Sequence, residues 1–211
     1  MEDIRISGIE TKSILTKSNL PASDYCANPY VGYTHECKYC YASFMRRFTG
    51  HREDWGSFLD VKFWSPLENV EKYRGRTVFL SSVTDPYNPQ KAVFKRTRTL
   101  LEELSGSGIR LSISTKSDLI VRDLDLIRNF PQAQVAWSVN TLDESFRADM
   151  DSAVTVERRL RAMKIFHDSG VRTTCWGCQE FCVNGILNHS LTLSPKTMEN
   201  WLMASPQLRI G

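Results

Sequence analysis

The chain has 211 residues, 41% of them hydrophobic, and a formal net charge of +3 at pH 7. This length and hydrophobic content suffice for one sizeable core without disulfides, and so small a net charge favours a nucleic-acid partner only weakly. The longest apolar runs have the length of strands and the N-terminus lacks a basic and apolar leader, so we expect neither a membrane span nor a secretory signal. These features predict a cytoplasmic protein with one domain.

The first 24 residues are polar and rich in Ser, Thr and Lys. A weak alternation of apolar residues at Ile4, Ile6 and Ile9 predicts an edge strand. We interpret 1–24 as an N-terminal extension that precedes the main domain.

Two cysteines, Cys37 and Cys40, follow the first strand-like segment of that domain. In a chain without secretory features, clustered cysteines are more typical of metal or redox sites than of disulfides. Their thiolates are soft ligands that suit zinc or an iron-sulfur cluster. The C-x2-C pair by itself therefore predicts a metal or thiol redox site without choosing between them.

The residues around this pair resemble the cluster-binding loop of radical S-adenosylmethionine (SAM) enzymes. That loop is C-x3-C-x2-C, and Tyr33 occupies the position of its first cysteine. The flanking residues are similar to the spore photoproduct lyase-like branch, and most closely to radical SAM mobile pair protein B. These residues are Tyr25 to Tyr30, His35, Tyr39, Tyr41 and Ala42.

The resemblance implies a [4Fe-4S] cluster with Cys37 and Cys40 as ligands, and SAM bound to the remaining iron. A phenol is a poor donor beside thiolates, so a third sulfur must replace the one absent at Tyr33. Cys26 is the nearest candidate, although it would equally serve as a small buried hydrophobe. Cys175, Cys178 and Cys182 form a second group, which could complete a composite site, bind zinc with Cys37 and Cys40, or remain free thiols.

The activity implied by the resemblance is lyase-like reductive cleavage of SAM to methionine and a 5'-deoxyadenosyl radical, which removes hydrogen from a substrate. Such an enzyme needs an electron donor such as flavodoxin or ferredoxin, and the family adds a companion radical SAM protein as a partner. The basic and aromatic residues Arg46, Arg47, His51, Trp55 and Phe58 would suit a nucleic-acid substrate or a solvated face over an aromatic core. The alternative function is that of a catalytically impaired or truncated member acting as a non-catalytic protein, or of a small zinc protein.

After residue 25 short apolar segments alternate with helical patterns, which predicts a parallel sheet of βαβ units. The segments expected to form strands are Tyr25–Ala27, Thr77–Val83, Arg110–Thr115, Gln134–Asn140 and Val171–Cys175. Periodicity does not distinguish an open sheet from a barrel. The resemblance implies a partial TIM-like (β/α) barrel over 25–175, incomplete with about five strands.

The first two helical patterns lie between these strands. Phe94, Thr97, Leu101 and Leu104 share one helical face, and the following glycines predict the end of that helix. A shorter helix is expected over 118–130, with Asp118 as its N-cap and with Leu119, Leu126 and Ile127 directed inward.

A third helix is predicted by the spacing of Val156, Leu160, Met163 and Phe166, with Thr155 as its N-cap. Its charged residues Arg158, Arg159 and Arg161 are expected to face outward. The remaining residues, 176–211, have no clear period and are expected to form an irregular C-terminal tail.

Polar residues end or follow three of the predicted strands, and the resemblance implies that strand ends carry the SAM-binding groups. We expect Thr84 and Asp85 to contact the SAM amino group, Lys116 its carboxylate, and Ser138 and Asn140 its methionyl or ribose portion. Tyr39 would lie beside the adenine. Each strand-end group could instead be an ordinary turn residue or a solvated charge.

Overall fold

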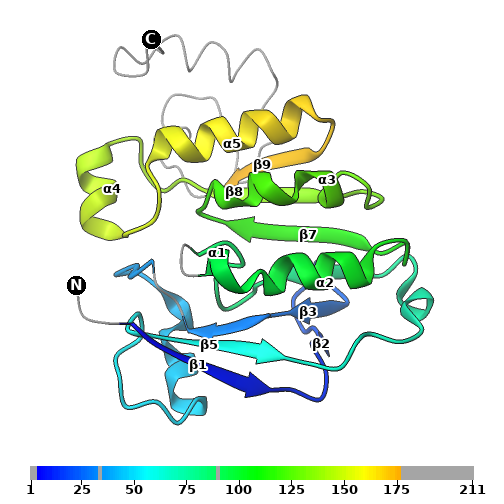
Figure 1. The fold of residues 1–211 in the computed structure, drawn as a ribbon. Coiled ribbons are helices and arrows are strands. Elements are labelled where there is room, and N and C mark those ends of the chain that lie inside the picture. Colours follow the sequence, from blue (N-terminus) through cyan, green and yellow to red (C-terminus); the bar gives the residue numbers. More distant parts are fainter. Residues whose placement is uncertain (1–3, 33–34, 89–90, 177–211) are drawn as a thin grey trace.

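The computed structural model describes residues 4–32, 35–88 and 91–176. Its main sheet has six strands in the order β2-β3-β6-β7-β8-β9 (Figure 1). The strands are β2 (Leu15–Lys17), β3 (Tyr25–Ala27), β6 (Thr77–Leu80), β7 (Arg110–Thr115), β8 (Gln134–Ser138) and β9 (Arg172–Trp176). All neighbouring pairs are parallel except β2 with β3. The five predicted parallel strands are thus confirmed, in a sheet that does not close.

Two of these strands end earlier than predicted. β6 ends at Leu80 because Ser81 adopts a left-handed backbone with φ of 67°, which turns the chain out of the strand. β8 ends at Ser138, so Asn140 lies beyond the strand.

A second sheet of three strands, in the order β1-β5-β4, contains part of the polar N-terminal segment. β1 (Arg5–Glu10) pairs in parallel with β5 (Phe58–Phe63), and β5 pairs antiparallel with β4 (Tyr30–Gly32). The edge strand predicted from Ile4, Ile6 and Ile9 is confirmed as β1. β4 and β5 were not predicted. β4 is only three residues long, whereas β5 does alternate, with apolar Leu59, Val61 and Phe63 between polar Asp60 and Lys62, and this strand signal was overlooked.

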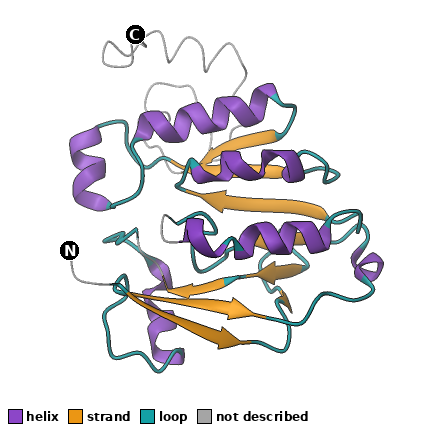
Figure 2. Cartoon of the chain, viewed as in Figure 1, coloured by secondary structure: helices purple, strands orange, loops and turns teal. Residues whose placement is uncertain are grey.

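The helical segments are α1 (Lys91–Phe94), α2 (Arg96–Leu104), α3 (Leu124–Ile127), α4 (Glu144–Met150) and α5 (Val156–Asp168), with 3-10 turns η1 (Tyr41–Phe48), η2 (Val70–Tyr73) and η3 (Leu119–Asp123). Figure 2 shows α2, α3 and α5 on the same side of the main sheet. None of the helices in the described ranges is long and apolar enough to cross a membrane.

The two faces of the main sheet have different side chains. Val78, Leu111 and Val135 point toward the helices and join a buried core with Leu101 and Phe166. On the opposite face Phe79, Ser112, Ser114, Gln134 and Ala136 line a cavity. The helix-covered face therefore stabilises the fold, and the other face is available for ligands.

Three details of the predicted helices were wrong. Phe94 is 36% exposed, because Lys95 adopts a left-handed φ of 49° and separates α1 from α2. Asp118 stands at the predicted N-cap position, but its side chain makes no capping hydrogen bond and instead accepts from Arg158. Arg159 was expected to face outward but is fully buried in an ion pair with Asp151.

Other helix predictions were confirmed. Thr155 caps α5 through a hydrogen bond from the amide of Arg158, at 3.3 Å. Gly106 and Gly108, after α2, both have positive φ angles of about 75°. These signals are local, which explains why the sequence alone revealed them.

Candidate functional site

A cavity of about 410 Å³ lies at the carboxyl ends of β6, β7, β8 and β9. Active sites of strand-helix barrels gather at this end of the strands. The side chains that line it are Cys37, Tyr39, Cys40, Tyr41, Ala42, Phe79, Ser81, Ser82, Val83, Thr84, Asp85, Ser114, Thr115, Lys116, Ser138 and Trp176. Most of the predicted site residues are therefore in one place.

The loop with Cys37 and Cys40 is held against the segment that joins α4 to α5. The Lys38 amide donates to the Met150 carbonyl at 3.0 Å, and the Ser152 amide donates to the His35 carbonyl at 2.7 Å. Cys37 is buried and Cys40 is half-buried. Both thiols consequently reach the cavity from a loop whose backbone is fixed on both sides of Cys37.

Asp85 is almost completely buried where the chain leaves β6. Its Oδ1 accepts hydrogen bonds from the Tyr87 amide and the Thr115 hydroxyl, each at 2.8 Å. Its Oδ2 accepts from the Lys116 amide at 2.7 Å and lies 3.3 Å from Nε2 of His35. Burial opposes ionisation, but the hydrogen bonds from His35 and from the two amides outweigh it and lower the pKa of Asp85.

Both oxygens of Asp85 are thus engaged by protein donors at the edge of the cavity. Thr84 is engaged as well, because its hydroxyl donates to the Gly32 carbonyl at 2.7 Å. These two side chains tie the loop after β6 to β7 and to the segment before the cysteines. Their first role in this fold is to shape the cavity.

Ser81 is a cavity residue that the sequence reasoning did not single out. It is only 5% exposed, yet among the described residues its hydroxyl has no hydrogen-bond partner. Buried hydroxyls without partners are rare in native proteins and indicate a missing water or ligand. Ser81 and Ser82 both fall inside the strand predicted over Thr77–Val83, so no sequence signal distinguished Ser81 as a cavity residue.

Lys116 and Ser138 line the cavity as predicted, from the ends of β7 and β8. The ammonium of Lys116 lies 5.6 Å from the centre of the Tyr39 ring. Asn140 is half-buried beyond β8 and is not among the lining residues. The expected convergence is therefore found for Tyr39, Lys116 and Ser138, whereas Asn140 is not among the lining residues and its contact with SAM stays a prediction.

Of the other cysteines, Cys26 and Cys175 lie in the described residues, and neither lines this cavity. Cys26 is buried in β3, and its thiol donates to Ser18 Oγ at 3.3 Å. Cys175 packs within the core under the helices. Tyr33, Cys178 and Cys182 lie outside the described residues. Within the described ranges, no group of three or more His, Cys, Asp or Glu side chains is arranged to hold a metal ion.

The basic and aromatic segment after the cysteine loop is folded inward in part. Phe58 is fully buried, and the ring of His51 stacks on it at 3.9 Å while facing Asp60 at 2.9 Å. Arg46 is paired with Asp54. Phe58 is therefore an aromatic core residue and not a surface on which a base could stack.

Relatives with similar sequences include proteins of Methanocaldococcus jannaschii and of Acidianus two-tailed virus. An uncharacterized protein of Methanocaldococcus jannaschii is 33% identical over 170 residues, which are 80% of this chain and 65% of that protein. An uncharacterized protein of Acidianus two-tailed virus is 28% identical over 70% of this chain and 53% of its own length. The chain thus spans about half to two thirds of the length of these relatives.

Solved structures of spore photoproduct lyase have the same fold. A mutant with bound AdoMet and dinucleoside spore photoproduct has a TM-score of 0.61 over 80% of this chain and 49% of its own, at 14% identity. Another, complexed with dinucleoside spore photoproduct, has a TM-score of 0.61 over 82% of this chain and 50% of its own, at 13% identity.

The sequence also matches a protein-family model. The model for the radical SAM superfamily matches residues 27–183, which include every described residue that lines the cavity. This range contains the cysteine loop and the parallel strands whose ends form the site. The chain therefore belongs to the radical SAM superfamily.

Proposed function

We propose that the cavity at the strand ends binds SAM beside an iron-sulfur cluster ligated by Cys37 and Cys40. One observation carries the proposal: two thiols, a lysine ammonium and the unpartnered hydroxyl of Ser81 line a single cavity. The combination suits a ligand with a carboxylate and several polar atoms next to a soft-metal centre. The likeness to spore photoproduct lyase supports a place in that branch of the superfamily.

Cys37 and Cys40 supply thiolates, which are the type of ligand that an iron-sulfur cluster requires. Two thiols reach the cavity within the described residues, and a [4Fe-4S] cluster with an open iron takes a third. Cys26 remains the candidate for that ligand on the described part of the chain. Its thiol is engaged with Ser18 and would have to leave that bond to join Cys37 and Cys40.

When bound, the cluster would supply the electron that cleaves SAM to a 5'-deoxyadenosyl radical for hydrogen abstraction. The protein's own residues would bind and orient the substrate of that step. Lys116 would pair with the carboxylate as a point charge, Ser138 and Ser81 would hydrogen-bond polar atoms, and Tyr39 would offer its ring to the adenine. Asp85 and Thr84 would act indirectly, by holding the loop after β6 in place.

Such cleavage needs one external electron, so a small electron-transfer protein such as flavodoxin or ferredoxin is the proposed partner. The substrate that loses hydrogen is left unassigned, because no side chain in the cavity identifies it. A non-catalytic metal-binding protein is the second candidate, favoured by the presence of only two cavity thiols in the described ranges.

Anaerobic reconstitution with iron and sulfide tests the proposal. The expected product contains iron and sulfide in equal amounts, binds SAM and forms 5'-deoxyadenosine when reduced with dithionite. Cys37→Ala and Cys40→Ala should each lose the iron. Iron and SAM binding without 5'-deoxyadenosine would support the non-catalytic candidate, and zinc binding without iron would overturn the cluster assignment.

A further inference from the structure

Tyr39 is the one aromatic residue between the two cysteines, and its phenol is held by a specific bond. The hydroxyl donates to Oδ2 of Asp151 at 3.1 Å, across 112 positions in the sequence. A phenol is protonated at neutral pH, so its hydroxyl acts as the donor to this carboxylate. The orientation of the ring is thus tied to a residue outside the cavity lining.

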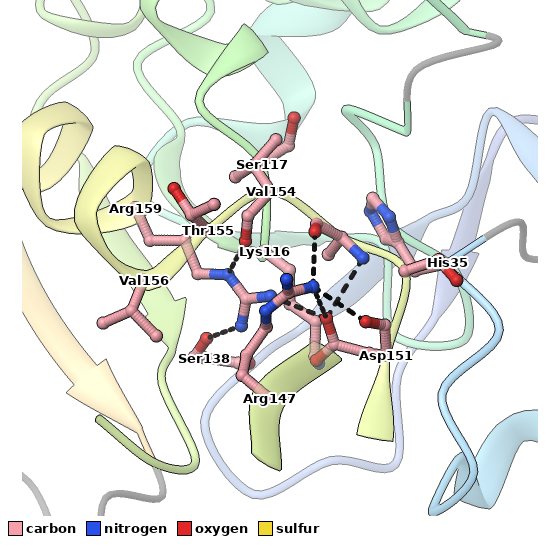
Figure 3. A network of polar contacts seen from close by, with 12 residues as sticks. His35, Lys116, Ser117, Ser138, Arg147, Asp151, Val154, Thr155, Val156 and Arg159 are labelled. Carbon is pink, nitrogen blue, oxygen red and sulfur yellow. Dashed lines mark hydrogen bonds and ion pairs between the residues drawn. The ribbon is translucent and has the colours of Figure 1, made fainter. Parts of the chain in front are cut away.

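Asp151 is itself fixed by a buried arginine. Nη2 of Arg159 donates to Oδ1 of Asp151 at 2.7 Å, and these side chains are only 1% and 2% exposed. Arg159 also donates from Nη1 to the Ser138 carbonyl at 2.9 Å and from Nε to the Val154 carbonyl at 2.8 Å. Figure 3 shows the guanidinium between the end of β8 and the segment that carries Asp151.

A second arginine braces the same segment. Nη1 of Arg147 donates to the carbonyls of Asp151 and Ala153, at 2.8 and 2.9 Å (Figure 3). The Asp151 amide closes α4 by donating to the Arg147 carbonyl at 2.9 Å. Asp151 therefore has few alternative positions, which is the condition for a carboxylate that orients another side chain.

We propose that Asp151 and Arg159 are positioning residues that set the Tyr39 ring and the Ser138 end of β8 relative to each other in the cavity. The inference rests on the proposed function, because the Tyr39 ring would contact the nucleoside part of SAM. An arginine with a planar donor fork joins two walls of one cavity more rigidly than water would. Neither Asp151 nor Arg159 is among the residues that line the cavity.

Tyr39→Phe tests this directly, because it keeps the ring and removes only the bond to Asp151. After anaerobic reconstitution the variant should retain the iron content of the parent and bind SAM at least about tenfold more weakly, the loss expected for one hydrogen bond to a charged group. S-adenosylhomocysteine, which carries the same nucleoside, should lose affinity by the same factor. Unchanged affinity for both ligands would overturn the proposal.

A double-mutant cycle separates positioning from direct contact. In an Asp151→Ala background, Tyr39→Phe should cause no further loss of SAM affinity, because both changes remove the same bond. A full additional loss would mean that the phenol contacts the ligand itself and would overturn the role of Asp151. If Asp151→Ala does not fold, unchanged SAM affinity in Tyr39→Phe would still overturn the proposal.

Asp149→Asn is the matched control. Asp149 pairs with Lys38 at 2.6 Å, so it joins the same two segments, but this pair is exposed and does not line the cavity. SAM affinity should remain at the parental value. If the parent protein holds a full cluster but does not bind SAM, the proposed function fails. If the parent and Tyr39→Phe bind SAM equally well, only the positioning role of Asp151 and Arg159 fails.

Discussion

The backbone amide of Lys116 donates a hydrogen bond to Oδ2 of Asp85 at 2.7 Å, which joins the end of β7 to the loop after β6. The same carboxylate accepts from Thr115 and from the Tyr87 amide and faces His35. One buried residue thus connects the cysteine loop, two strand ends and the wall of the cavity. Replacing Asp85 should therefore lower the stability of the fold even when no ligand is bound.

Asp85→Asn should destabilise the protein by about 3 kcal/mol, the cost of breaking a buried charged network. The introduced amide group would turn a donor toward the Lys116 or Tyr87 amide, which are also donors. Denaturant unfolding measures the loss. Asp168→Asn, which removes an exposed pair with Lys164, should change the free energy of unfolding by less than about 1 kcal/mol. An equally small effect of Asp85→Asn would contradict the structural role.

The lowered pKa of Asp85 also predicts an acid dependence. Because the folded pKa lies below the ordinary value, this carboxylate contributes stability above a pH of about 4, and the contribution declines as the pH falls below that value. The free energy of unfolding should therefore decrease more steeply on acidification in the parent than in Asp85→Asn. Parallel curves between pH 5 and pH 2, by denaturant unfolding, would refute this.

Ser81→Ala should have opposite effects on stability and on binding. Without ligand the variant should be more stable by about 1 kcal/mol, because it removes a buried hydroxyl that lacks a partner. With the reconstituted protein, SAM should bind several-fold more weakly. Thermal unfolding with and without SAM measures both effects.

Ser82→Ala provides the comparison for this variant, since Ser82 lines the same cavity and its Oγ accepts from Asn28 Nδ2 at 3.3 Å. This change should lower the stability of the unliganded protein. If Ser81→Ala were likewise destabilising without ligand, its hydroxyl would have a partner in the unliganded protein, and its assignment to the ligand would fail.

Tyr33→Cys would restore the third thiolate position of the C-x3-C-x2-C loop. The parent chain should hold less iron than a full cube, or hold it more labile toward chelators, because a phenol is a poor ligand for these irons. The variant should retain more iron per monomer during chelator challenge. Equal retention by both proteins would indicate that another cysteine already serves, and Cys26→Ala would then show whether it is that residue.

The parallel strands and the site at their ends could be predicted from the sequence because their signals are local. Short apolar runs mark the strands. In a parallel sheet, the residues at the carboxyl ends of the strands lie along the same edge. This is why Lys116 and Ser138 were expected beside Cys37 and Cys40, and they do line one cavity with them.

The residues that the sequence did not reveal depend on distant partners. Arg159 occupies a charged position of an amphipathic pattern, and only the loop around Asp151 makes its burial favourable. Ser81 differs from Ser82 through a left-handed backbone that no neighbouring residue requires. The burial of Asp60 in β5 depends likewise on His51, which lies outside the strand.

The most direct test of the central claim is a titration of the anaerobically reconstituted, reduced protein with SAM, followed by the electron paramagnetic resonance spectrum of its cluster. The account predicts that SAM saturably changes the spectrum, and that Lys116→Met requires at least about tenfold more SAM, as expected for a lost charged contact. A cluster whose spectrum is unaffected by saturating SAM would contradict the assignment of this cavity.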